Sequence, residues 1–188
     1  MKTKAKGEYG YRNSHIKIQA IKVACCVVLI LAQLIARNFT DNQAAKNILT
    51  VMAILSVLPM ANIASPFLVS LRYRTSGHDF YEKVSANTQG PILYDLILTS
   101  PEQVIPADAV MVHPVGVFVY CSNPKLDAKK AETYLNTTFK SRKLDPNVKV
   151  FLSEDKFLKR LKSLKPSSAY EDDGSVEYAA SLLKSLSM

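Results

Sequence analysis

Two long apolar segments constrain this chain more than any other feature. The first covers residues 21–39, with a charge-free stretch at 23–36, and the second covers residues 48–71 and carries no charge. At ~1.5 Å per residue, a helix of the second segment's length crosses the ~30 Å hydrocarbon core of a bilayer. The first is shorter, but Lys22 and Arg37 can extend their stems to the headgroups. The sequence therefore predicts two transmembrane helices, at about 21–39 and 48–71.

Two alternatives compete with this prediction. A soluble protein could bury the two segments as a helical hairpin, but so small a chain has too little other material to cover both. The first segment could instead be a cleaved signal peptide. Its basic leader is long, however, and Leu34 before Ala36 breaks the small-x-small cleavage pattern. Within the second segment, Pro59 and Pro66 predict kinks and Asn62 requires a polar partner.

The charges predict the orientation of the helices. The formal net charge is +8, and residues 1–71 hold eight Lys and Arg against two acids. The basic flanks lie at 1–22 and 72–74, whereas the loop between the segments is nearly neutral. By the positive-inside rule, we expect a multi-pass protein of the cell membrane with both termini in the cytoplasm. Residues 1–20 then form a basic cytoplasmic segment, and anionic membrane lipid is an expected partner.

The residues after the second segment have a globular composition. The pattern predicts an α+β domain over 72–165 with the order αβββαβα and a mixed four-stranded sheet, followed by a linker and an amphipathic helix over 166–188. The expected elements, in order, are a helix over 76–89, strands over 91–100, 108–113 and 115–122, a helix over 126–144, a strand over 148–153 and a helix over 153–165. Ser76, Asp127 and Ser153 are the expected N-caps.

Several stretches of this domain carry a family resemblance. They are "YEKV" with Glu82, "ILYDLIL", "IPADAVMVHPVGVFVY" and "CSN". In this order, from about residue 77 to 164, they resemble the nuclease-related domain (NERD) of the restriction-endonuclease-like PD-(D/E)XK superfamily. The resemblance implies a nuclease-like fold. It also implies that Asp108 falls on the family's metal-binding aspartate, that Cys121 falls on its glutamate and that Asn123 falls on its lysine.

These replacements bear directly on catalysis. Cleavage in this superfamily needs a carboxylate pair to hold Mg²⁺ or Mn²⁺ and a lysine to orient or activate water. A thiol near neutral pH carries little charge, and an amide is no cation. We therefore expect a pseudoenzyme without a cofactor, in which Glu82, Asp108, Cys121 and Asn123 are remnants of a site and Asp108 is a weak metal candidate. The protein would then be an interaction or scaffold protein of unknown pathway.

Other interpretations of the same residues stay open. Glu82 and Asp95 could supply carboxylates to a rearranged site, which would make the protein a membrane-tethered, metal-dependent nuclease. Asp108 could be a solvent-facing residue at the start of a strand, and Cys121 a small apolar core residue. A nucleophilic dyad of Cys121 with His113 has no visible third group to orient it.

A basic stretch lies in the last part of the domain. Residues 124–165 hold twelve Lys and Arg against five acids. The basic surface consists of Lys156, Lys159, Arg160, Lys162 and Lys165. A solvated helix face explains it most simply, and contact with anionic lipid comes next. Nucleic-acid binding is possible but unsupported, because stacking aromatics are not interleaved with the charges. Small residues around Asn62 suit packing against another membrane protein or a second copy.

Overall fold

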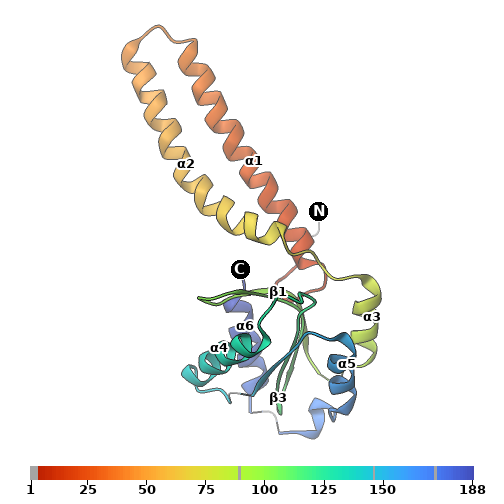
Figure 1. Cartoon of the computed structure of the whole chain (residues 1–188). Coiled ribbons are helices and arrows are strands. Elements are labelled where there is room, and N and C mark those ends of the chain that lie inside the picture. The colour runs from red at the N-terminus through yellow and green to blue at the C-terminus, as the bar shows by residue number, and fades with distance from the viewer. Residues whose placement is uncertain (1–3, 89, 146, 172) are drawn as a thin grey trace. The chain divides into compact units, whose positions relative to one another are not determined.

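The computed structural model describes residues 4–88, 90–145, 147–171 and 173–188 (Figure 1). The chain forms two compact units. One is residues Asn13–Arg74, and the other combines the residues up to Arg12 with Thr75–Met188. The N-terminal residues therefore belong to the same unit as the C-terminal domain, although two long helices separate them in the sequence.

The first unit is a helical hairpin. Helix α1 spans Tyr11–Asn38 and helix α2 spans Gln43–Leu71. The predicted apolar segments lie within these helices, and each helix begins before the apolar segment does. Asn42 caps α2, because its side-chain oxygen accepts the Ala44 N–H at 2.9 Å. Figure 1 shows α2 bent in its C-terminal part, where Pro66 lacks the N–H of a regular helical turn.

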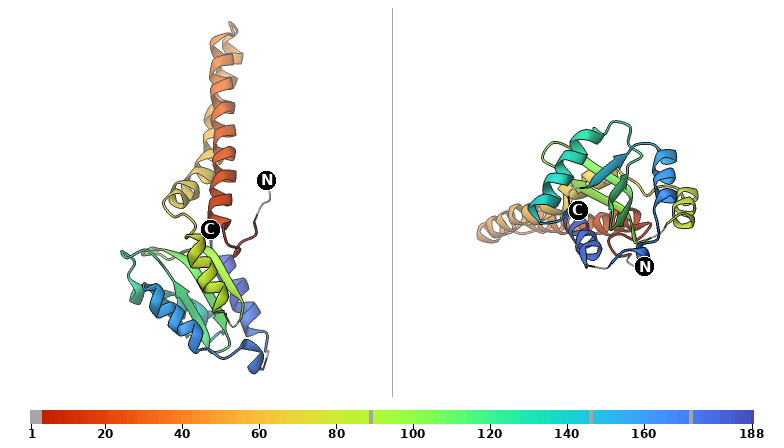
Figure 2. Two further views of the ribbon diagram at one scale, coloured as in Figure 1. Left: turned by 90° about the vertical axis from the view of Figure 1, so that its right-hand side faces the viewer. Right: turned by 90° about the horizontal axis from the view of Figure 1, so that it is seen from below.

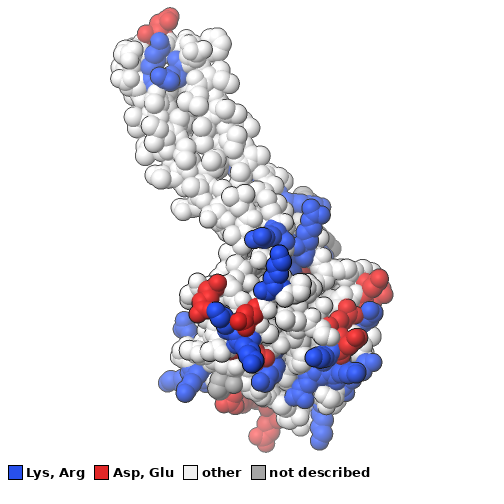
Figure 3. Space-filling view, viewed as in Figure 1, with Lys and Arg blue, Asp and Glu red and all other residues white. Residues whose placement is uncertain are grey.

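Both helices are long and apolar enough to cross a membrane. Their apolar side chains are largely exposed within this chain; Val28 and Leu58, for example, are both 65% exposed. The space-filling view shows charged side chains at the loop end of the hairpin and an uncharged flank along the two helices (Figure 3). The chain does not bury this apolar surface itself, which disfavours the buried hairpin of a soluble protein.

The second unit contains the predicted mixed four-stranded sheet. Its strands are β1 (Ile92–Thr99), β2 (Val104–His113), β3 (Gly116–Tyr120) and β4 (Val148–Phe151), in the spatial order β1-β2-β3-β4. The first two pairings are antiparallel, and β3 pairs with β4 in parallel. The α+β fold with a mixed sheet is thus confirmed. Strand β2 begins earlier than the predicted 108–113, because residues 104–107, in the stretch expected to be a turn or a short strand entry, already pair with β1.

Helices cover both faces of the sheet, as the view from below shows (Figure 2). One face carries α4 (Ala128–Ser141) and α6 (Ser175–Leu186), and the other carries α3 (His78–Ala86) and α5 (Glu154–Ser163). A short 3₁₀ helix, Ser167–Ala169, lies in the predicted linker. Helix α6 was expected outside the domain, yet its buried residues join the core cluster on the α4 side.

The two ends of the chain cover the outer edge of β1. The Gly7 carbonyl accepts the Tyr94 N–H at 2.8 Å. Farther along the strand, the Ser187 hydroxyl accepts the Ile97 N–H at 3.2 Å, and the Met188 N–H donates to the Ile97 carbonyl at 3.0 Å. An uncovered strand edge exposes unpaired backbone groups that invite association. Part of the predicted basic segment 1–20 therefore lies, through Gly7, at the edge of the sheet.

The contact at Ser187 gives a first prediction. We expect Ser187→Ala to lower the free energy of unfolding by about 1–3 kcal/mol, because it leaves the buried Ile97 N–H without its acceptor. Ser185→Ala is the matched control, since its hydroxyl donates to the Leu182 carbonyl of its own helix. Denaturant unfolding of the full chain in detergent measures both. Equal effects of the two substitutions would contradict the assigned role of Ser187.

Candidate functional site

The side chains of β1 change faces at Asp95. Leu93 lies in the core on the α4 and α6 side, and so do Leu96 and Leu98. In a regular strand, residues 93 and 96 would point to opposite faces. Asp95 has a φ of +58°, in the left-handed region that few non-glycine residues adopt. The backbone conformation of Asp95 thus produces the inversion, and its carboxylate does not follow the alternation of side chains along β1.

The side chains of strand β2 also change faces, at Asp108. Ala107 before it and Val110 after it both lie in the core on the α4 and α6 side. The pairing of β1 with β2 continues in one register on either side of the inversion, which leaves Asp95 and Asp108 opposite one another. Two carboxylates, each on an interior strand position, are therefore brought to one place.

Arg12 supplies the positive charge between them. Its side chain is buried, and its Nη1 lies 2.6 Å from Asp108 Oδ1. Its Nη2 donates to the Leu96 carbonyl at 2.9 Å, and its Nε lies 4.0 Å from Asp95 Oδ1. We call Arg12, Asp95 and Asp108 the buried charge cluster.

Backbone and hydroxyl groups hold the other carboxylate oxygens. Asp108 Oδ2 accepts the Ser122 N–H at 2.7 Å. Asp95 Oδ2 accepts the Gly10 N–H at 2.7 Å and the Thr75 hydroxyl at 2.8 Å. Asp95 Oδ1 is buried and, within the described part of the chain, accepts no hydrogen bond. Both oxygens of Asp108 are thus engaged, whereas Asp95 keeps one unsatisfied acceptor.

The charges of the cluster do not balance. One guanidinium faces two carboxylates, and all three groups are withdrawn from water. Burial raises the pKa of Asp95, although the Thr75 hydrogen bond and the Arg12 charge act in the opposite direction. Protonation of Asp95 would leave one cation facing one anion, and the raised pKa favours that state.

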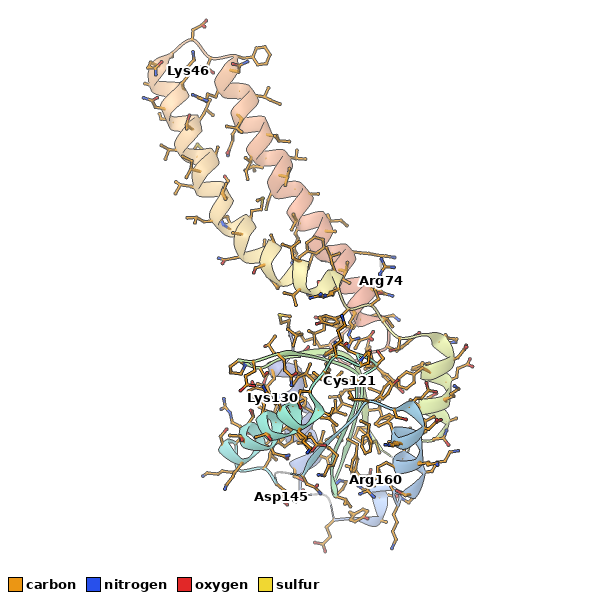
Figure 4. All side chains as sticks on the ribbon, in the orientation of Figure 1. Lys46, Arg74, Cys121, Lys130, Asp145 and Arg160 are labelled. Carbon is orange, nitrogen blue, oxygen red and sulfur yellow. The ribbon has the colours of Figure 1, made fainter. Side chains whose placement is uncertain are left out.

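The structure places the predicted site residues in different environments. Asp108 is 2% exposed in the middle of β2, so the prediction of a solvent-facing residue at a strand start is wrong. Cys121 follows β3 and packs in the core (Figure 4). Burial and the nearby Asp108 charge raise the pKa of its thiol, so it stays protonated at neutral pH. Asn123 accepts the Lys125 N–H at 3.1 Å in the turn that follows.

Two further candidates lie outside the buried charge cluster. Glu82 is 67% exposed on α3, where its carboxylate lies 3.3 Å from His78 Nε2. His113 is turned toward the chain that follows α5, because its Nε2 lies 2.9 Å from the Lys165 carbonyl. Its Nδ1 accepts the Val115 N–H at 3.2 Å, so both ring nitrogens are occupied and neither serves a dyad with Cys121.

These residues do not fit a divalent metal. Magnesium and manganese need several oxygen ligands, and here the oxygens of Asp108 are taken by Arg12 and a backbone N–H. Over residues 4–88, 90–145, 147–171 and 173–188, no group of three or more His, Cys, Asp and Glu side chains is arranged to hold a metal ion. Asp108, which the nuclease resemblance makes a metal ligand, is paired instead with Arg12 from the N-terminal segment.

Arg12 could not be recognised from its charge, because it resembles any other basic residue beside an apolar segment. A local signal is the glycine pair in "GEYGYR". Gly7 has a φ of +93° and Gly10 a φ of +86°, both in the left-handed region. A Cβ on Gly7 would lie 2.9 Å from Leu93 Cδ2. The glycines therefore allow the segment to approach β1 closely and to bring the Gly10 N–H and Arg12 to Asp95.

The predicted basic surface lies on and just after α5. Its four lysines, Lys156, Lys159, Lys162 and Lys165, are exposed. Arg160 differs, because its guanidinium lies 4.7 Å from the centre of the Phe118 ring and packs on the sheet (Figure 4). The four lysines are therefore more exposed to solvent than Arg160.

A scan against protein-family models, a search of curated proteins and a search of solved structures each returned no match for this chain. The nuclease-like interpretation therefore stays a prediction from the sequence motifs.

The ion pair gives a second prediction. Arg12→Ala should lower the free energy of unfolding by about 3–5 kcal/mol, because two buried carboxylates lose their counter-charge. In the double variant Arg12→Ala with Asp108→Asn one of those charges is gone, so the combined loss should be smaller than the sum of the single losses. Near-ultraviolet circular dichroism of the tyrosines follows unfolding of the full chain in detergent.

The control for this cycle is Lys17→Ala, an exposed residue of the same helix. We expect it to change the free energy of unfolding by less than about 0.5 kcal/mol. Strict additivity of the Arg12 and Asp108 substitutions would show that the two side chains do not interact energetically.

The raised pKa of Asp95 gives a third prediction. Between the ordinary Asp pKa and the raised value, the folded chain holds a proton that the unfolded chain has released. The stability contributed by this group is therefore present at low pH and is lost as pH rises through the folded pKa. We expect the stability of wild type relative to Asp95→Asn to fall as pH rises, because asparagine cannot ionise and tolerates the left-handed backbone.

Thermal unfolding of both chains in one detergent, across the acidic to neutral range, measures this difference. Contributions from carboxylates remote from the buried charge cluster are the same in both chains and cancel in the comparison. A difference that stays constant or grows with pH would exclude the proposed protonation of Asp95.

Proposed function

We propose that this protein is a two-span integral membrane protein whose nuclease-like domain has lost its catalytic centre and serves as an interaction or scaffold module. The observation that carries the proposal is the ion pair between Arg12 and Asp108, in which Nη1 and Oδ1 lie 2.6 Å apart. Asp108 is the residue that the NERD resemblance assigns to metal binding. A protein that uses this carboxylate for a fixed internal ion pair does not offer it to a metal ion.

The neighbouring positions support the same conclusion. Where the resemblance expects a second carboxylate, Cys121 is a buried thiol with a raised pKa. Where it expects an ammonium group, Asn123 takes part in a turn. Neither residue can stabilise the charge that develops during phosphodiester cleavage. The fold that the resemblance implies would thus be kept for its surface and its stability.

Membrane insertion is supported by the two apolar helices and their exposed side chains. The residues before α1 and after α2 belong to one compact unit, which agrees with both ends of a hairpin returning to the same side of a bilayer. The basic flanks favour the cytoplasm for that side. We therefore propose a multi-pass protein of the cell membrane with both termini in the cytoplasm.

The proposed partners follow from the exposed chemistry. The lysines of α5 suit the anionic headgroups of the inner leaflet. The apolar flanks of α1 and α2, with Asn62 and its small neighbours, suit another membrane protein or a second copy of this chain. Nucleic acid has no comparable support.

A second candidate function is a membrane-tethered nuclease with a rearranged site. One observation favours it, namely that Asp95 and Asp108 lie on facing strand positions and both approach Arg12. Removal of Arg12 would free two carboxylates at one place. In that case Asp95 would take the role that the resemblance gives to the position of Cys121.

Cleavage assays separate the two candidates and provide a fourth prediction. Purified full chain in detergent is incubated with DNA and RNA in Mg²⁺ or Mn²⁺, beside Asp108→Ala, Arg12→Ala and the double variant. We expect no cleavage above the Asp108→Ala background from the wild-type chain. Wild-type cleavage that disappears in Asp108→Ala would overturn the scaffold proposal. Cleavage gained in Arg12→Ala and lost again in the double variant would favour the rearranged nuclease.

A further inference from the structure

Arg12 lies in the first turn of α1, and the same helix continues without a break to Asn38. The residue that holds the buried charge cluster and the residues that form the first apolar segment are thus parts of one helix. A continuous helix transmits displacement along its axis, because its backbone hydrogen bonds resist stretching and bending. No such connection is made by α2, since the chain after Leu71 leaves the helix before it reaches Thr75.

We infer that Arg12 is a mechanical link through which the position of α1 in the bilayer controls the middle of strand β2, at Asp108, and the chain just after strand β3, at Ser122. The inference rests on the proposed insertion of α1 into a membrane. It adds a regulatory device to a domain for which the proposed function gives only an interaction role.

The geometry makes the link sensitive. The guanidinium lies 2.6 Å from Asp108 and 2.9 Å from the Leu96 carbonyl, inside a buried site. A helix displacement of ~1.5 Å, the rise of one residue, exceeds the range over which a hydrogen bond persists. Because water does not reach these groups freely, the broken contacts would not be replaced. A small movement of α1 therefore has two outcomes. The guanidinium is either seated, with its bonds to Asp108 and the Leu96 carbonyl intact, or unseated, with both bonds broken.

The Ser122 amide reports which state is present. Its N–H donates to Asp108 Oδ2 at 2.7 Å, and Arg12 holds the other oxygen of that carboxylate. Ser122 itself is exposed, so its amide exchanges with solvent once this hydrogen bond opens. The adjacent Cys121 N–H donates to the Phe151 carbonyl at 3.0 Å and belongs to the parallel pairing of β3 with β4. This second amide serves as an internal reference, because its hydrogen bond goes to β4 and not to the buried charge cluster.

Bilayer thickness provides the displacement. A membrane helix answers a change of hydrocarbon thickness by tilting or shifting, because mismatch exposes apolar surface. The test is to reconstitute the full chain in phosphatidylcholine bilayers of short and long acyl chains and to measure hydrogen exchange of the Ser122 and Cys121 amides. We expect the Ser122 amide to exchange at rates that differ by at least about threefold between the two bilayers, while the Cys121 amide stays unchanged.

Two substitutions at one exposed position test whether helix continuity carries the effect. Lys17→Pro removes a backbone N–H between Arg12 and the apolar segment and kinks the helix there. Lys17→Ala is the matched control, since it removes the charge and preserves the helix. Ser122 exchange should depend on thickness in wild type and Lys17→Ala, and it should lose that dependence in Lys17→Pro.

The possible results distinguish this inference from the proposed function. If the chain is extracted from vesicles by alkaline carbonate, it is not inserted, and both the membrane proposal and the link are wrong. If it is inserted but Ser122 exchange does not vary with thickness, or varies equally in Lys17→Pro, the link alone is overturned. Arg12→Gln supplies the unseated reference, with rapid Ser122 exchange in both bilayers.

Discussion

Three charged groups, one guanidinium and two carboxylates, are buried together where β1 and β2 reverse their side-chain faces. Each depends on the others, because an isolated charge in such surroundings is far costlier than the paired set. The N-terminal segment has to lie against β1 to deliver Arg12, and Asp95 has to adopt a left-handed backbone to meet it. The sheet edge, the course of the N-terminal segment and the environment of Asp108 all follow from this requirement.

A buried ion pair of this kind specifies a structure more than it stabilises one. Apolar side chains of similar volume would fill the same space without a desolvation penalty. What the charges add is selectivity, since few other arrangements of the chain satisfy Arg12, the Leu96 carbonyl and both carboxylates together. The proposed scaffold role requires a surface with one fixed shape. A unique arrangement of the strands would therefore matter even in a domain without catalysis.

Local patterns in the sequence predicted much of the fold. The apolar segments, the αβββαβα order and the mixed sheet could be predicted because each depends on neighbouring residues. Asp127 caps α4 as expected, with its side chain accepting the Lys130 N–H at 3.1 Å. Ser153 stands at the expected N-cap of α5 but makes no side-chain capping bond, and the N-cap of α3 is Gly77 rather than Ser76.

The buried charge cluster could not be predicted in this way. Arg12 and Asp108 are 96 positions apart in the sequence, and the glycine pair before Arg12 does not show which distant residue this arginine meets. The inversion of β1 and β2 was also hidden, because the alternation on each side of Asp95 and Asp108 is regular by itself. The structure around the buried charge cluster is determined by ion pairing between residues far apart in the sequence, and local propensity does not predict it.

The bonds that residues near both ends of the sequence make to β1 have a consequence for the order of folding. Gly7 bonds to Tyr94, and Ser187 bonds to Ile97, which lies 90 positions away in the sequence. Contacts between residues so far apart form late, because the intervening chain must first be brought together. We therefore expect β1 to keep an open outer edge until the rest of the sheet has formed, and an open edge favours association between partly folded chains.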